Sequence, residues 1–266
     1  MQEIWDLILY NFVGILIVFA RIMGVFIFNP ILGRNTVPMR VRVAMTIVLT
    51  MAMLSYLSGG SDVVGYIPGS AVGFAGTLIF EGLLGFVFGF IVNMILSVLL
   101  LGGKIIDNQM TLALAETMNP AMGATMGISA NLYYNMFILY FFLIGGHLSY
   151  INLFALSYDI IPIGHIGLGL AWRTTFENLT YFLTTIFTLA VKMAMPIIAA
   201  EMILQMCVGV IMKAVPSIQI FVINIQLKLF MGFFMILAIA APMSDFLQKL
   251  LDIMFANLYG VLSSFG

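Results

Sequence analysis

The stretch GGKIIDNQMTLALAETMNPAMGATMG, residues 102–127, is polar, contains Gly and Pro, and separates two long apolar blocks. Residues 82–103 and 117–157 contain no Asp, Glu, Lys or Arg, so the charges in between stand out. These charges are Lys104, Asp107 and Glu116. Irregular backbone next to membrane segments is tolerated only where protein or a water-filled cavity satisfies its amides and carbonyls. We therefore predict that residues 102–127 form a loop that lines a cavity.

Composition indicates an all-α, polytopic integral membrane protein. Of the 266 residues, 63% are hydrophobic and 8% are charged, and the mean hydropathy is +1.16. Ordinary soluble domains carry about 25% charged residues. The N-terminal residues include Glu3 and Asp6 where a secretory signal would have Lys or Arg, so we expect the first apolar segment to be retained. The net charge of -1 gives no argument for nucleic-acid binding.

Six stretches are apolar enough to be helices that cross the membrane, for which about 20 residues are needed. The third, fifth and sixth are long and contain Gly or Pro, so each is expected to be bent, tilted or partly outside lipid. The six stretches are residues 7–28, 41–57, 70–101, 128–156, 176–211 and 217–244.

Five charged residues fall inside these apolar stretches, where each would cost about 2.5 to 3.5 kcal/mol at a helix centre. They are Arg21, Glu81, Lys192, Glu201 and Lys228. Lys192 and Glu201 are nine residues apart and lie on opposite sides of one helix, so they cannot pair with each other. Their partners are expected on other helices, on other subunits or in water. A plainer alternative is that these residues snorkel or form buried ion pairs that serve assembly alone.

The sequence contains only weak matches to motifs for catalysis or cofactor binding. We therefore expect neither an enzyme nor a cofactor or metal site. His147 and His165 are the two histidines, and their spacing does not place two ligands on one helical face. An ion-coupled secondary transporter that uses the membrane charges is the main alternative. Such a transporter is expected to show an inverted repeat with paired broken helices, and the sequence shows no such repeat.

Methionines gather in the central stretch, and Met is flexible and polarizable enough to close around objects of many shapes. They are Met110, Met118, Met122 and Met126, the last three at four-residue spacing around Pro120 and Gly123. This cluster suits a seal over a pore that passes dissimilar chains. The alternative is that Met serves here only as another apolar residue.

Several blocks of the sequence together resemble the FliR family of export-gate subunits, which serves flagella and related type III secretion systems. The resemblance covers nearly the whole chain and rests on the ordered set of blocks, since no single motif is diagnostic. The blocks are FARIMGVFIFNPILGRNTVPMRVRVAMTIVLT (19–50), GGKIIDNQMTLALAETMNPAMG (102–123), FFLIGGH (141–147), SYDIIPIG (157–164) and MPIIAAEMILQMCVGVIMKAVPSIQIFVINIQLKLFMG (195–232).

The resemblance implies a non-enzymatic subunit of a protein-export channel in the bacterial inner membrane and the flagellar basal body. Its implied partners are P-type and Q-type gate subunits, a FlhB-type switch protein and exported unfolded flagellar proteins, with a virulence system as the alternative setting. Bent helical hairpins would assemble into a helical ring. The implied regions are residues 1–101 (P-subunit-like hairpins), 102–127 (central plug loop), 128–175 (helices and connector) and 176–266 (Q-subunit-like hairpin that turns at 213–216).

The resemblance also assigns roles to individual residues. The implied plug or gate residues are Gln109, Met110, Met118, Pro120, Met122, Gly123 and Met126. The residues expected to act as intersubunit or buried charges are Arg21, Glu81, Lys192, Glu201, Lys213 and Lys228.

Overall fold

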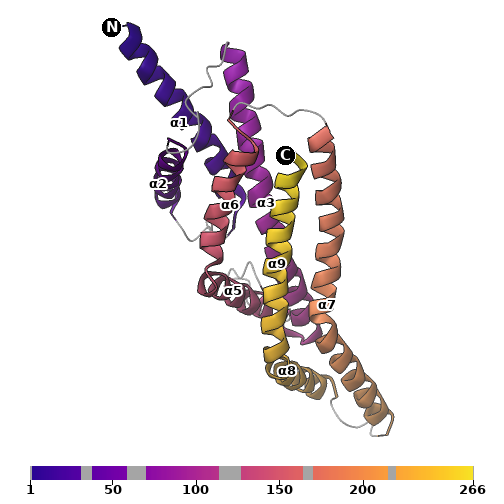
Figure 1. The fold of residues 1–266 in the computed structure, drawn as a ribbon. Helices are drawn as coiled ribbons and strands as arrows, with labels where there is room; N and C mark the ends of the chain where they lie inside the picture. Colours follow the sequence, from indigo (N-terminus) through magenta and orange to yellow (C-terminus); the bar gives the residue numbers. More distant parts are fainter. Residues whose placement is uncertain are drawn as a thin grey trace. The chain divides into compact units, whose positions relative to one another are not determined.

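The structure is a computed structural model, and it describes residues 2–30, 38–58, 70–113, 127–163, 170–214 and 220–265. The described residues form helices and no strand, which confirms the predicted all-α class. Figure 1 shows the course of the helices along the chain. They are α1 (Gln2–Phe28), α2 (Met39–Ser58), α3 (Ala71–Gln109), α5 (Ile128–Leu143), α6 (Gly146–Ile160), α7 (Leu170–Ala214), α8 (Ile220–Ala238) and α9 (Ala240–Phe265).

The lengths and hydropathy of these helices agree with a multi-pass membrane protein. Among the described residues, three helices contain a stretch that is long and apolar enough to cross a bilayer by itself: Met39–Leu57, Ala71–Gln109 and Arg173–Lys213. The number rises to five if the broken pairs α5 with α6 and α8 with α9 each count as one crossing. Helix α1 contributes a shorter apolar part, Phe12–Phe28.

The predicted loop at residues 102–127 is wrong for its first eight residues, because α3 continues without interruption to Gln109. At two glycines in this part of α3, neighbouring helices occupy the space that a side chain would take. A Cβ on Gly102 would meet the side chain of Met193, and a Cβ on Gly103 would overlap the backbone of Ala130 at less than 3.0 Å. Close packing therefore holds the helix together where Gly by itself would weaken it.

Two of the predicted segments are broken rather than continuous. The fourth, residues 128–156, is interrupted at Gly145, which has the left-handed φ of +74° that Gly adopts without strain. The sixth, residues 217–244, bends by 65° between α8 and α9. By contrast, α7 continues through Pro196. Hydropathy therefore locates the apolar stretches, whereas it does not locate the bends.

The chain divides into two compact units. Unit 1 consists of Met1–Met94, Gly145–Thr180 and Met254–Gly266, and unit 2 consists of Ile95–Ile144 and Tyr181–Ile253. Helices α3, α7 and α9 contribute residues to both units. The four regions implied by the family resemblance stay a prediction, because they describe likeness to partner subunits and not contacts within one chain.

Within unit 1, helices α1 and α3 approach so closely that only glycine fits between their backbones. A Cβ on Gly24 of α1 would lie closer than 3.0 Å to the carbonyl oxygen of Gly82 on α3. A Cβ on Gly85 or Gly89 of α3 would collide with a carbonyl oxygen of α1. Small residues at such a seam let helix backbones come together, as is common between membrane helices. This seam positions the buried charges described next.

Candidate functional site

A buried arginine in α1, Arg21, pairs with an acidic residue of α3 inside unit 1. Its Nε donates a hydrogen bond of 2.5 Å to Oε2 of Glu81, and the exposed fractions of the two side chains are 0% and 1%. A charge buried without a partner would carry a large desolvation penalty. The pair therefore gives both charges a partner within the chain, on a different helix.

The other edge of the Arg21 guanidinium faces the end of α6. Nη1 donates to the carbonyl oxygen of Ser157 at 3.0 Å and to its Oγ at 3.1 Å, and Nη2 donates to the carbonyl oxygen of Ile161 at 3.0 Å. The last carbonyls of a helix lack partners within it and form its negative end. Arg21 therefore acts as a cap for α6.

An aromatic ring completes the surroundings of Arg21. Its Cζ lies 4.1 Å from the ring centroid of Tyr158, a cation–π arrangement. The Tyr158 hydroxyl donates to the carbonyl oxygen of Val18 at 3.4 Å, on the same helix as Arg21. One guanidinium thus joins α1, α3 and α6. Because the cluster is fully buried, it can fix three helices together, but its polar atoms are not accessible to a substrate.

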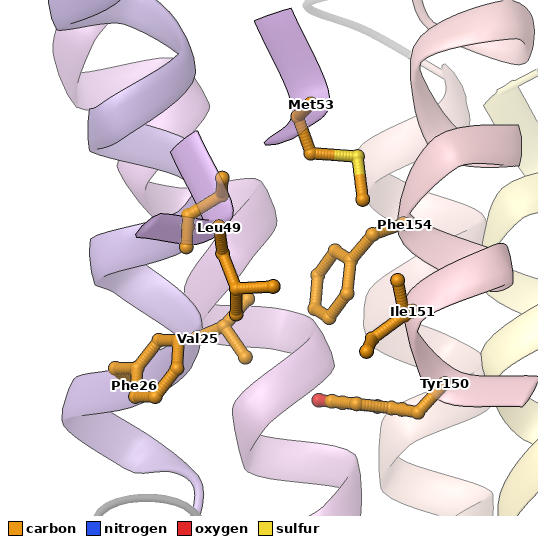
Figure 2. A pocket seen from close by; sticks show the side chains of 8 residues that line it. Val25, Phe26, Leu49, Met53, Tyr150, Ile151 and Phe154 are labelled. Atoms are coloured by element: carbon orange, nitrogen blue, oxygen red, sulfur yellow. The ribbon is translucent and has the colours of Figure 1, made fainter. Parts of the chain in front are cut away.

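A small apolar pocket lies in the same unit between α1, α2 and α6 (Figure 2). Tyr150 lines the pocket, and its hydroxyl accepts a hydrogen bond of 3.2 Å from Nδ2 of Asn29. The side chains labelled in Figure 2 are Val25 and Phe26 of α1, Leu49 and Met53 of α2, and Tyr150, Ile151 and Phe154 of α6. The apolar lining offers packing contacts and no reactive group.

In unit 2, Asp107 ties the end of α3 to the beginning of α5. Its Oδ1 accepts a hydrogen bond of 3.0 Å from the backbone N–H of Ser129, in the first turn of α5. The N-cap position of α5 is Gly127, which has no side chain that could cap the helix. The Asp107 carboxylate supplies that acceptor from another helix and lies at the positive end of the α5 dipole.

Two of the predicted gate residues fall in the part of the chain that the structure describes. Gln109 is the half-buried last residue of α3, and Met110 is 0% exposed. Met110 covers Gly232 of α8 so closely that a Cβ on this glycine would overlap its side chain. The remaining predicted gate residues lie outside the described residues: Met118, Pro120, Met122, Gly123 and Met126.

The other predicted charges do not come together as Arg21 and Glu81 do. Lys192 and Lys213 of α7 are exposed. Glu201 of α7 is 1% exposed, and neither of its carboxylate oxygens has a hydrogen-bond partner in the described part of the chain. Lys228 of α8 is near enough to Glu201 to interact with its charge, but no salt bridge joins the two. A role of these residues between subunits stays a prediction.

Comparison with known proteins identifies the family. A family model described as bacterial export proteins, family 1, matches residues 12–254. The chain belongs to this family. As a family 1 bacterial export protein with several membrane-length helices, it is a multi-pass protein of the inner membrane. The predicted FliR-type resemblance is confirmed.

Curated relatives of this family 1 export protein include flagellar biosynthetic proteins and a surface presentation of antigens protein. The flagellar biosynthetic protein FliR of Caulobacter vibrioides is 25% identical over 246 residues, which cover 89% of this chain and 94% of the relative. FliR of Escherichia coli is 26% identical over 243 residues, 91% and 90% of the two chains. The surface presentation of antigens protein SpaR of Shigella sonnei is 26% identical over 221 residues, 82% of each chain.

Sequence reasoning about this export protein missed most partners of its buried polar groups. The carbonyl oxygens of Ser157 and Ile161 leave no signal in a sequence, because every residue has a carbonyl. The seam between α1 and α3 did leave a signal in the sequence. Gly85 and Gly89 are four residues apart, a spacing of small residues typical of close helix pairs. A search for that spacing would have placed α3 against another helix.

Proposed function

We propose that the chain is the R-type subunit of a flagellar type III export gate in the inner membrane and basal body. In this proposal its partners are P-type and Q-type gate subunits and a FlhB-type switch protein, and the cargo is unfolded flagellar proteins. In this role the chain forms part of the wall of a shared channel and helps to close that channel, and it performs no catalysis of its own. The family match over residues 12–254 supports the export role, and the flagellar relatives support the setting.

One observation supports assembly with other subunits: the position of Lys192. It lies near the middle of the apolar stretch Arg173–Lys213, and it is exposed beside the exposed apolar side chains of Val191 and Met195. A lysine that faces lipid at mid-bilayer costs about 2.5 to 3.5 kcal/mol. A polar or acidic surface of a neighbouring subunit, or channel water, removes this cost. We therefore place this face of α7 against a partner or the channel.

The residues between Met110 and Gly127 are the proposed closure of the channel. Met118, Met122 and Met126 would seal it when no substrate is threaded, since flexible Met side chains adapt to many shapes. Deletion of residues 116–126 is expected to raise ion leakage through the reconstituted gate and to leave its assembly intact. Unchanged conductance would contradict this part of the proposal.

Co-purification tests the proposal as a whole. The tagged full-length chain, extracted in mild detergent, is expected to carry P-type and Q-type subunits with it. Lys213→Ala is expected to lower their recovery, with a difference that depends on salt concentration. Equal recovery at low and high salt would exclude a role of Lys213 in subunit contact. A stable monomer that transports solutes without partners would overturn the proposal and favour the secondary transporter.

A virulence-type export gate is the second candidate, and the 26% identity to SpaR of Shigella sonnei supports it. Complementation separates the two settings. The chain is introduced into one strain that lacks its flagellar R-type subunit and into another that lacks its virulence counterpart. Restored swimming without restored virulence secretion supports the flagellar setting, and the reverse result supports the alternative.

A further inference from the structure

The pocket of unit 1 is lined by apolar side chains of α1, α2 and α6 (Figure 2). Most of the lining residues are buried, whereas Leu49 of α2 and Ile151 of α6 are half-exposed. The pocket therefore opens between α2 and α6. The hydroxyl of Tyr150 is bonded to Asn29, and the described lining residues offer a water molecule no further polar group. Water is held in such a space only where it finds polar partners, so an apolar group fits this pocket better.

Helix α2 presents exposed apolar side chains next to this opening. Met45, Val48 and Met51 are 47%, 66% and 60% exposed. No charged residue follows Arg42 in α2, and the stretch Met39–Leu57 is long and apolar enough to cross a bilayer. Acyl chains are as apolar as these side chains, so such a surface is stable beside them. The pocket therefore opens at a surface where acyl chains are available.

Two arginines lie at the beginning of α2. Arg42 is half-buried and precedes Leu49 by seven residues, so it lies on the same face of the helix, about 10 Å away along the axis. Arg40 is exposed. Arginines close to a short connection between apolar segments are typical of the cytoplasmic side, where anionic lipid head groups make the membrane surface negative. The guanidinium group matches the oxygens of a phosphate and binds them with paired hydrogen bonds.

We propose that α2 and α6 bind an anionic phospholipid, with its phosphate at Arg40 and Arg42 and part of one acyl chain in the pocket between Leu49 and Ile151. A phospholipid carries a negative group and an apolar chain in the same order in which α2 carries its arginines and the pocket. A membrane helix of another protein would cover the apolar face, but it would also need an acidic group at the level of the arginines. The inference goes beyond the proposed function and does not depend on it, because it concerns the lipid around the chain rather than export.

Native mass spectrometry of the full-length chain in detergent tests the arginines. The probes are phosphatidylglycerol and phosphatidylcholine with identical acyl chains, because these lipids differ in net charge. The wild-type chain is expected to retain phosphatidylglycerol in preference to phosphatidylcholine. Arg40→Gln and Arg42→Gln are each expected to lower this preference about 5-fold, and the double variant about 30-fold. Equal retention of the two lipids by the wild-type chain would overturn the inference.

Arg173→Gln is the matched control for the loss of a positive charge. It removes an arginine of α7 that is paired with Glu177 at 3.1 Å. The lipid preference of this variant is expected to stay close to that of the wild-type chain. A fall as large as that in Arg42→Gln would attribute the preference to total charge and would overturn the proposed site.

Photo-crosslinking in isolated native membranes that contain the full-length chain tests the pocket. Phosphatidylglycerol with a diazirine in one acyl chain is expected to label α2 near Leu49 and Met53 or α6 near Ile151, and an excess of unlabelled phosphatidylglycerol is expected to suppress the labelling. Leu49→Phe fills the mouth of the pocket and is expected to lose the labelling, whereas Val48→Phe on the exposed side of α2 is expected to keep it. Labelling confined to other helices would overturn the inference. Absence of labelling would show that protein covers this face and would overturn it too.

Discussion

Arg21 and Glu81 form a salt bridge that is asymmetric in its hydrogen bonds. The guanidinium makes hydrogen bonds to Glu81, Ser157 and Ile161, whereas Oε1 of Glu81 has no hydrogen-bond partner among the described residues. Glu81 therefore depends on Arg21 more than Arg21 depends on Glu81. Loss of the arginine leaves a bare buried carboxylate, whereas loss of the carboxylate leaves an arginine with helix-end carbonyls still around it.

Arg21→Met is expected to destabilise the protein by about 3 to 5 kcal/mol, because it strands the Glu81 charge. Glu81→Leu is expected to cost less than Arg21→Met. In the double variant Arg21→Met/Glu81→Leu no charge is stranded, so its loss is expected to be smaller than the sum of the two single losses. Thermal unfolding of the purified full-length protein in detergent measures all three.

Arg173→Ala is a matched control for the buried pair. Arg173 donates to Glu177 at 3.1 Å, but the two side chains are 78% and 65% exposed. Exposed pairs four residues apart on a helix contribute about 0.3 to 0.5 kcal/mol. A loss after Arg173→Ala as large as that after Arg21→Met would show that the assay does not report burial of the pair.

The seam between α1 and α3 predicts a contrast between two glycines of the same helix. Gly85→Ala would push a Cβ into the carbonyl oxygen of Arg21, whereas a Cβ on Gly76 meets nothing within 4 Å. Overpacking of this kind costs about 1 to 3 kcal/mol. Gly76→Ala is expected to be neutral or to stabilise α3 by up to about 1 kcal/mol. Membrane abundance and unfolding temperature of the two variants should diverge, and equal values would contradict the close approach.

The backbone of Thr111 has a left-handed φ of +61°, and this conformation predicts that a substitution by glycine is stabilising. Left-handed backbone costs about 1 to 2 kcal/mol for a residue with a Cβ, and glycine avoids this cost. Thr111→Gly is therefore expected to raise the unfolding temperature of the purified chain, after a partial offset from the greater freedom of Gly in the unfolded state. Thr111→Val retains the strain and loses the hydroxyl, which donates to the Met110 carbonyl oxygen at 2.6 Å. It should be the less stable of the two, and the opposite order would exclude strain at this position.

Lys192 predicts opposite effects on the lone chain and on the complex. Lys192→Leu removes a charge from the middle of an apolar helix, so insertion of the lone chain is expected to improve or to stay unchanged. Recovery of partner subunits by co-purification is expected to fall in the same variant. Lys192→Arg keeps the charge and should retain the partners. Full recovery of partners with Lys192→Leu would remove the argument that this side chain faces them.

Apolar stretches predicted the class of fold and most of the helices, because a membrane helix is specified by composition over about 20 residues. By hydropathy alone, the sixth apolar stretch ended at residue 244, since polar residues of α9 lower its hydropathy, although the family resemblance implied a hairpin over residues 176–266. The buried residues of α9 nevertheless recur at helical spacing. They are Met243, Leu247, Leu250, Leu251, Met254, Leu258, Val261 and Leu262. Periodicity, rather than hydropathy, would have extended the prediction to the end of this helix.

The sequence predicted that the buried charges have partners, but it did not predict which groups those partners are. An arginine and a glutamate inside apolar stretches had to find partners, and that expectation follows from Arg21 and Glu81 as residue types. Which groups they meet depends on contacts across 60 to 140 positions of the sequence. The helical state of Gly102 and Gly103 could not be predicted either, because the neighbours that fill their missing side chains come from α7 and α5. For the buried charges and for the two glycines, contacts between distant helices, rather than local sequence, determine the structure.

The partners of Arg21 also set an order of events during synthesis of the chain. Glu81 follows Arg21 by 60 residues and Ile161 follows it by 140. At about 5 to 20 residues per second, the ribosome supplies the first partner after about 3 to 12 s and the last after about 7 to 28 s. During this interval α1 carries a charge without its final acceptors, which costs about 2.5 to 3.5 kcal/mol where the arginine lies in lipid. The hydrogen-bond network of Arg21 can therefore be completed only after α6 and Ile161 have been made.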